Sequence, residues 1–206
     1  MARTDLRRAV GVTVLATLAG LLVAAAPADS PVNVPEPQDL YDGPQHGYTP
    51  ETLKGATVVN LAGLDKLIAN DKPLLLDVVL ADRKPEGLPP GTLWLPSHRS
   101  IPGAVWLPGA GVVPLTPEQQ AAFFKRIEEL TGGDKSKPIV TFCRPECWGS
   151  WNAGKRLIGA GYSRIYWWPL GVEGWQDTHD TSVVEADKAW TASTKEKAPP
   201  PVAPQH

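Results

Sequence analysis

This chain has few cysteines, histidines and methionines, and it has no excess of positive charge. Its 206 residues include two cysteines, four histidines and one methionine, and the formal net charge is −2. Two cysteines cannot complete a structural zinc site without histidines at ligand spacing, and these histidines are not so spaced. Nor does a histidine follow a Cys-x-x-Cys pair, as haem attachment requires. We therefore expect no metal or other cofactor, and without excess positive charge we expect no nucleic-acid partner.

Charge is absent from a long stretch near the N-terminus. Residues 9–26 are uncharged and mostly apolar, follow three arginines in the first eight residues, and precede the small-residue sequence Ala26-Pro27-Ala28. This arrangement is typical of a secretory signal peptide. We predict a signal peptide over residues 1–28, a mature chain beginning near Asp29 and a periplasmic location. An uncleaved membrane anchor is the alternative.

Internal repeats are lacking too, and the length suits one domain with flanking segments. Residues 29–56 are rich in proline, which predicts an extended N-terminal lead. The lead is a tether or a wrap, and docking through Tyr41 and Tyr48 is favoured. Apolar content falls after Asp177, so residues 179–206 are predicted to be a disordered tail. The folded domain is expected over residues 57–178.

Strand-like apolar runs and helix-like stripes alternate within that domain. The run at 74–80 is almost unbroken, which indicates burial on both faces of its sheet. Thr116 and Gln119 form a capping-box pattern at the start of the clearest helix. The order of elements predicts an α/β fold, an open parallel sheet with helices on both faces. Predicted strands are 57–59, 74–80, 104–107, 138–142 and 163–168, and predicted helices are 61–71, 117–130 and 150–158.

Both cysteines lie between a predicted strand and a predicted helix, in the sequence Cys143-Arg-Pro-Glu-Cys147-Trp148. Backbone N–H groups and the positive end of the helix converge on such a loop and lower the pKa of a thiol there. Cys143, first in the loop, is the predicted reactive thiol. A Cys143–Cys147 disulfide closes a very short ring and adds only about 2 kcal/mol, so an exchanging bond is favoured over a structural staple.

The residues around the cysteines have competing interpretations. Arg144 and Glu146, on either side of Pro145, are expected to be solvated loop charges, with stabilisation of a thiolate as the alternative role of Arg144. Trp148 and Trp151 are expected in an aromatic core layer, and the alternative is that they shield a thiol or face a ligand.

Two further polar residues lie outside this loop. Asp77 is expected to bond the backbone at the end of a strand. His98 falls in a long predicted surface loop over residues 81–102, where a plain surface role is favoured over catalysis.

Several segments resemble the rhodanese-like domain family. Leu74 to Val78 resembles its apolar strand ending in Asp, the sequence Ser100-Ile-Pro-Gly-Ala-Val resembles its "H-I-P-G-A" turn, and the loop from Cys143 resembles its active loop. The resemblance covers residues 57–176 and implies a rhodanese-like fold with Cys143 at the catalytic position. It departs at Trp148, where the family's active loop usually has arginine.

A narrower group fits more of the sequence: exported proteins associated with catabolism dependent on pyrroloquinoline quinone, named for a CXXCW motif. The shared features are the cysteine pair followed by Trp148, Ser150 to Ala153, Tyr166 to Pro169 and Gly174 to Gln176. Three residues separate the cysteines here, whereas the group's label implies two. Membership implies an accessory role in alcohol oxidation, with a quinoprotein alcohol dehydrogenase or its cytochrome as the periplasmic partner.

Three function classes follow for the cysteine pair. Cys147 would attack a persulfide on Cys143 and expel sulfide, which disfavours a stable sulfur carrier. Thiol–disulfide exchange or reductant-dependent sulfur release, with Cys143 and Cys147 as the catalytic residues and a small thiol or sulfur donor as substrate, is therefore the first hypothesis. A thiosulfate-type sulfurtransferase is the second. A non-catalytic docking module with a structural disulfide is the third.

Overall fold

A computed structural model of the protein describes residues 33–82, 85–89 and 97–195. The predicted signal peptide, residues 1–28, lies outside these ranges. Within them, no helix combines the length and apolar character needed to cross a membrane.

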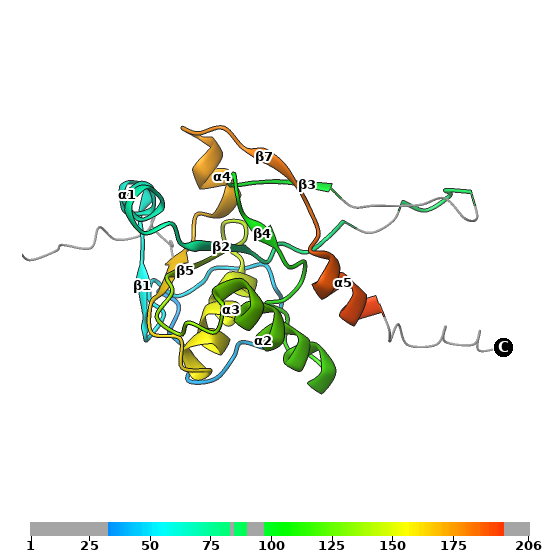
Figure 1. Ribbon diagram of the computed structural model, residues 1–206, viewed down its shortest axis with the longest axis horizontal. Helices are drawn as coiled ribbons and strands as arrows, with labels where there is room; N and C mark the ends of the chain where they lie inside the picture. The colour runs from blue at the N-terminus through cyan, green and yellow to red at the C-terminus, as the bar shows by residue number, and fades with distance from the viewer. Residues whose placement is uncertain (1–32, 83–84, 90–96, 196–206) are drawn as a thin grey trace, which may run out of the picture.

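Five parallel strands form the central sheet, in the spatial order β1-β6-β5-β2-β4 (Figure 1). The middle strand β5 is fully buried and pairs with β2 and β6, as Val140 opposite Leu75 and Tyr166 illustrates. Its apolar and β-branched residues suit burial on both faces. The strands are β1 (Ala56–Val58), β2 (Leu74–Asp77), β4 (Val105–Trp106), β5 (Ile139–Phe142) and β6 (Ile165–Trp168).

Helices cover both faces of this sheet, because successive side chains of a buried strand point to opposite sides. Leu75 and Val140 pack in one apolar cluster with α1 and α4, whereas Leu76 and Ile139 pack in another with α2 and α3. Figure 1 shows α1 and α4 on one side of the sheet and α2 and α3 on the other. The predicted α/β fold is confirmed. The helices are α1 (Leu61–Asp71), α2 (Pro117–Thr131), α3 (Trp148–Gly159) and α4 (Gly171–Gln176).

The predicted capping box begins α2. The N–H of Gln119 donates to Oγ1 of Thr116 at 3.2 Å, and Oε1 of Gln119 accepts the N–H of Thr116 at 2.9 Å. Gly132 ends the helix in the left-handed region, at φ 66°, a conformation that glycine adopts without strain.

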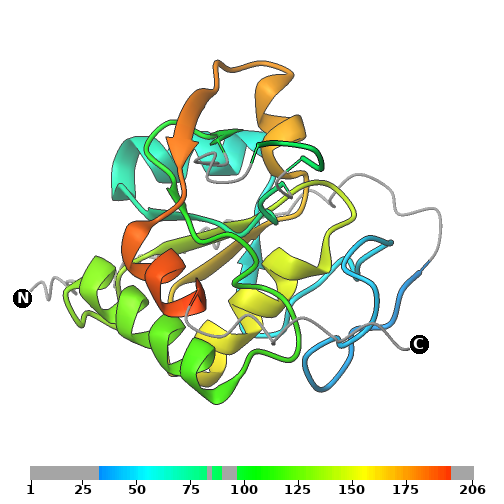
Figure 2. The same ribbon diagram turned by 90° about the vertical axis from the view of Figure 1, so that its right-hand side faces the viewer.

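Residues beyond Asp177 are ordered as far as residue 195, so the predicted disorder over residues 179–206 is wrong for this part. β7 (Ser182–Glu185) pairs antiparallel with β3 (Ser97–Ser100), and α5 (Lys188–Lys195) lies against α2 (Figure 2). Trp190 of α5 is 2% exposed and donates from Nε1 to the carbonyl of Pro108 at 2.9 Å. One buried tryptophan anchors a segment whose average apolar content is low. Residues 196–206 lie outside the described ranges.

Two other segments differ from the sequence prediction. β3 falls inside the predicted loop over residues 81–102, and its pairing with β7 depends on the tail that was expected to be disordered. α4 is not among the predicted helices, and it forms because Trp175 and Val172 bury one face of this short helix against the sheet.

The N-terminal lead docks on α3, as Figure 2 shows for the blue segment beside the yellow helix. Tyr41 stacks on Trp148 with ring centroids 3.8 Å apart. Its backbone N–H donates to Oδ1 of Asn152, whose Nδ2 donates back to the Tyr41 carbonyl, both at 2.9 Å. Tyr48 is 41% exposed and is not an anchor. The lead is thus a wrap fixed by one of the two predicted tyrosines.

Candidate functional site

The two cysteines form a disulfide where the central strand passes into α3. Cys143 directly follows β5 and Cys147 is the N-cap of α3, with their Cα atoms 6.2 Å apart. Both residues are nearly buried, at 4% and 7% exposure. Because the sulfurs are bonded to each other, both lie close to the positive end of the α3 dipole.

α3 begins earlier than predicted, and this changes which cysteine thiolate the helix stabilises. The prediction used Ser150 as the helix start and gave Cys143 the lower pKa. In the structure α3 begins at Trp148, and the N-cap residue is Cys147, whose side chain makes no capping hydrogen bond. A thiolate at an N-cap is stabilised by unpaired backbone N–H groups and the helix dipole. We therefore expect Cys147 to be the more acidic thiol when the bond is reduced.

The start of α4 supports the cysteine loop from one side. The N–H of Val172 donates to the carbonyl of Cys143 at 3.1 Å. Gly171 has φ 60°, and a Cβ there would overlap the Cys143 carbonyl and the backbone of Arg144. Only glycine combines this backbone conformation with such close approach. The position of Cys143 therefore depends on a glycine outside the loop.

The N-terminal lead covers the loop from another side. The N–H of Gly47 donates to the Glu146 carbonyl at 2.9 Å, and the N–H of Trp148 donates to the Gln45 carbonyl at 3.0 Å. His46 and Cys147 lie between these two bonds as an antiparallel pair. The lead is thus part of the site.

The two tryptophans next to the cysteines belong to the packed interior. Trp148 is 3% exposed and Trp151 is fully buried. Trp151 meets Trp148 edge-on at 5.5 Å and donates from Nε1 to the Thr52 carbonyl at 3.0 Å. They fix the lead to α3, as an aromatic core layer does, and present no open face to a ligand.

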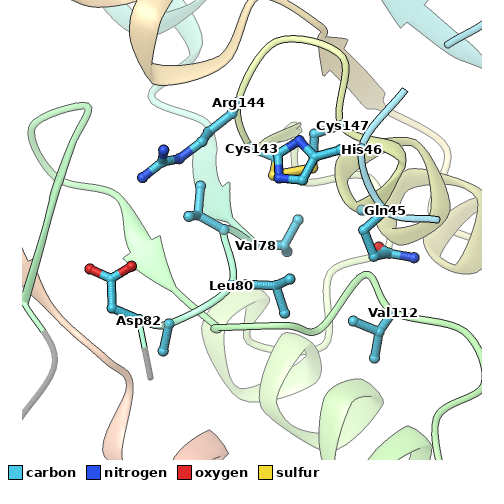
Figure 3. A pocket seen from close by; sticks show the side chains of 12 residues that line it. Gln45, His46, Val78, Leu80, Asp82, Val112, Cys143, Arg144 and Cys147 are labelled. Carbon is cyan, nitrogen blue, oxygen red and sulfur yellow. A yellow bond between two sulfur atoms is a disulfide. The ribbon is translucent and has the colours of Figure 1, made fainter. Parts of the chain in front are cut away.

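A cavity of about 290 Å³ opens beside the disulfide (Figure 3). Residues 78–81, which follow β2, and Val112 give it an apolar wall, and both cysteines line it. Figure 3 shows the imidazole of His46 beside the disulfide and Arg144 and Asp82 at the other side of the cavity. The cavity brings a disulfide, a histidine and an apolar surface together. The other polar side chain that lines it is Gln45.

The predicted loop charges are exposed, and Pro145 between them is half-buried. Nε of Arg144 lies 3.8 Å from Oε1 of Glu173, and both side chains are more than a third exposed. Such a pair contributes about 0–1 kcal/mol because solvent screens it. Arg144 also lines a second cavity of about 290 Å³ with His98.

Asp77 bonds the backbone as predicted and also holds two side chains. Its Oδ1 accepts the N–H of Val79 at 2.9 Å, and its Oδ2 accepts the hydroxyl of Ser100 and lies 2.8 Å from Nε2 of His98. The His98 side chain is only 10% exposed. The prediction of a plain surface role for His98 is therefore wrong, because β3 places this residue over a buried carboxylate.

A buried arginine that the sequence analysis did not single out supports the cavity wall. Arg156 of α3 is 6% exposed and donates from Nη1 to the Ala110 carbonyl at 3.0 Å and from Nη2 to the Val112 carbonyl. Burial lowers the pKa of this guanidinium to about 10. It remains charged at neutral pH and fixes the segment that contributes Val112 to the cavity.

His46 and Val112 were also missed, because they reach the cysteines only through folding. No local motif marks either residue, and the histidine lies far from the loop in sequence. Among the described residues, no group of three or more His, Cys, Asp or Glu side chains is placed to hold a metal ion.

Comparison with known proteins supports the fold and one family. The profile of the rhodanese-like domain family matches residues 60–178, more than half of the chain. A search among curated proteins found no match.

Three similar solved structures are distant. A human single-domain sulfurtransferase is 22% identical, with a TM-score of 0.38 over 61% of this chain and 99% of that one. A thiosulfate sulfurtransferase from Pseudomonas aeruginosa is 18% identical, with a TM-score of 0.41 over 62% of this chain and 20% of that one. The polysulfide-sulfur transferase homodimer from Wolinella succinogenes is 20% identical, with a TM-score of 0.37 over 61% and 76%. Likeness this distant says nothing about activity. On the strength of the family profile, the chain belongs to the family of rhodanese-like domains.

Proposed function

We propose that the protein carries out thiol–disulfide exchange through Cys143 and Cys147. The observation that carries this proposal is the Cys143–Cys147 disulfide itself, which joins the end of β5 to the N-cap of α3 and lines a cavity. A four-residue separation gives the bond little value as a staple. The helix end, in contrast, stabilises the thiolate that forms when the bond opens.

The two sulfurs have different roles in this exchange. An incoming thiolate attacks Sγ of Cys143, the bond between the protein sulfurs breaks, and its electron pair goes to Sγ of Cys147. A thiol of lower pKa leaves faster, so the N-cap residue is the better leaving group. The product is a mixed disulfide on Cys143 next to a Cys147 thiolate. In the reverse direction Cys147 attacks that mixed disulfide and releases the bound thiol.

Sulfur transfer through a Cys143 persulfide is the second candidate. Because Cys147 is the disulfide partner of Cys143, its thiolate would attack such a persulfide and release sulfide. Sulfur bound to Cys143 would be short-lived unless an acceptor took it first. This favours exchange, or reductant-dependent sulfur release, over a stable carrier.

The pH dependence of alkylation tests the exchange mechanism. In the Cys143→Ser variant we expect Cys147 to be alkylated with a midpoint well below the free-thiol value of about 8.5. In the Cys147→Ser variant the midpoint of Cys143 should lie nearer that value. Iodoacetamide labelling followed by intact mass gives both curves. Midpoints at or above about 8.5 for both thiols would leave only a structural disulfide.

We also infer export and an accessory role near quinoprotein alcohol oxidation, with a periplasmic quinoprotein dehydrogenase or its cytochrome as partner. Support comes from the signal-like residues 1–28 and the Cys143–Trp148 motif. The protein recovered from cells is expected to have an intact mass that begins near Asp29. Full-length protein retained in the inner membrane would contradict cleavage and favour an anchor.

A further inference from the structure

The backbone pairing between the lead and the cysteine loop places His46 directly opposite Cys147. The bonds from Gly47 to Glu146 and from Trp148 to Gln45 enclose this pair on both sides. His46 and Cys147 therefore exchange no backbone hydrogen bonds with each other. In an antiparallel pair of this kind the Cα atoms are about 4.5 Å apart and the side chains lie on the same face.

Both side chains of this pair turn toward the same cavity. His46 and both cysteines line it, and in the view of Figure 3 the imidazole overlaps the disulfide. In the described part of the chain, the imidazole of His46 makes no side-chain hydrogen bond or ion pair, whereas His98 and His179 each face a carboxylate. Among the described residues, no other side chain therefore competes with the site for the ring of His46.

The other charged groups around the cavity are placed differently. Arg144 and Asp82 lie at its far side in Figure 3, and Arg144 faces Glu173. Glu146, next to Cys147 in the chain, is exposed. His46 is consequently the ionisable side chain that the fold pairs with Cys147.

We propose that His46 is the acid–base partner of Cys147, a role that rests on the proposed exchange function. The ring takes the proton of an incoming thiol, whose sulfur then attacks Sγ of Cys143. As the bond between Cys143 and Cys147 breaks, the electron pair goes to Sγ of Cys147, and the resulting thiolate lies beside the imidazolium that His46 has become. One thiol and one disulfide are consumed, and one mixed disulfide and one thiolate–imidazolium pair are formed. The reverse reaction uses His46 as the base that removes the Cys147 proton.

The cavity also indicates the kind of thiol. One wall is apolar, formed by residues 78–81 and Val112, and the single arginine at the edge is accompanied by Asp82 and Glu173. An anion such as thiosulfate would find no excess of positive charge there. The site therefore fits an uncharged thiol, such as a cysteine side chain of a peptide flanked by apolar residues.

The test compares alkylation of Cys147 in Cys143→Ser and in Cys143→Ser/His46→Gln. Loss of the imidazole should raise the midpoint by about one pH unit, which slows alkylation at pH 7 about tenfold. Cys143→Ser/His46→Lys restores a positive charge and should restore the low midpoint. Cys143→Ser/His179→Gln is the matched control, because His179 stacks on Trp175 and does not line the cavity; its curve should match that of Cys143→Ser.

Superimposed curves for Cys143→Ser with and without His46→Gln would overturn the role of His46 while leaving the exchange function intact. A midpoint in the His46→Lys protein as high as that in the His46→Gln protein would also overturn the role of His46 and leave the exchange function intact. A high midpoint in Cys143→Ser itself would instead contradict the exchange function. Because His46 is exposed and its pairing uses backbone atoms, all variants should melt at the temperature of Cys143→Ser.

Rates of exchange give a second readout. Opening of the oxidised wild-type disulfide by a neutral cysteine peptide should slow about tenfold in His46→Gln at pH 7, and the difference should vanish above about pH 9, where the attacking thiol ionises without help. A constant ratio at all pH values would show a structural effect and contradict proton transfer by His46.

Discussion

Reduced Cys147→Ser protein is expected to accumulate a mixed disulfide on Cys143 when it meets oxidised glutathione at pH 7. Reduced wild-type protein should form the internal disulfide instead, because Cys147 resolves the intermediate. The two cysteines lie in one loop with their Cα atoms 6.2 Å apart, so resolution should exceed attack by free glutathione at least about 100-fold. Acid quenching, peptide mapping and intact mass identify the adduct and its position.

Two outcomes of that experiment would contradict exchange. If wild-type protein accumulates the adduct to the same extent as Cys147→Ser, then Cys147 does not resolve it. If neither protein forms an adduct, the pair is unreactive and the disulfide is structural. The Cys143→Ser/Cys147→Ser protein, which lacks thiols, is the control for adducts at other sites.

Reaction with thiosulfate distinguishes the sulfurtransferase alternative from thiol–disulfide exchange in the same set of variants. A transferase should yield a persulfide on Cys143 in the Cys147→Ser protein and should pass that sulfur to an added acceptor. The exchange mechanism predicts mixed disulfides with glutathione in this variant and no transfer of sulfur from thiosulfate to the acceptor.

The sheet and the cysteine loop could be predicted because their signals are local. The apolar run that forms β5, the helical stripe of α2 and its capping box each depend on neighbouring residues, and the structure confirms them. The start of α3 was misplaced for an equally local reason. The prediction began the helix at Ser150 because the apolar pattern changes to helical spacing there. The actual N-cap, Cys147, is not a favoured cap residue and makes no side-chain cap hydrogen bond.

Contacts between distant segments could not be predicted from local patterns. His46 meets Cys147 only because Tyr41 stacks on Trp148 and directs the lead across α3. Trp190 likewise fixes an otherwise polar C-terminal segment through its hydrogen bond to Pro108. Its helix α5 follows β7, the strand that pairs with β3 and so with His98. In each case one or two buried side chains fix a segment whose composition alone suggests an extended or disordered chain.

The equilibrium between the dithiol and the disulfide tests the central claim most directly. Stabilisation of the Cys147 thiolate by the N-cap favours the reduced form and raises the reduction potential, as in disulfide oxidoreductases. Titration of the wild-type protein in glutathione buffers, with alkylation and intact mass to count free thiols, should give a potential between about −270 and −120 mV. A potential below about −300 mV would identify a structural disulfide and contradict the exchange function.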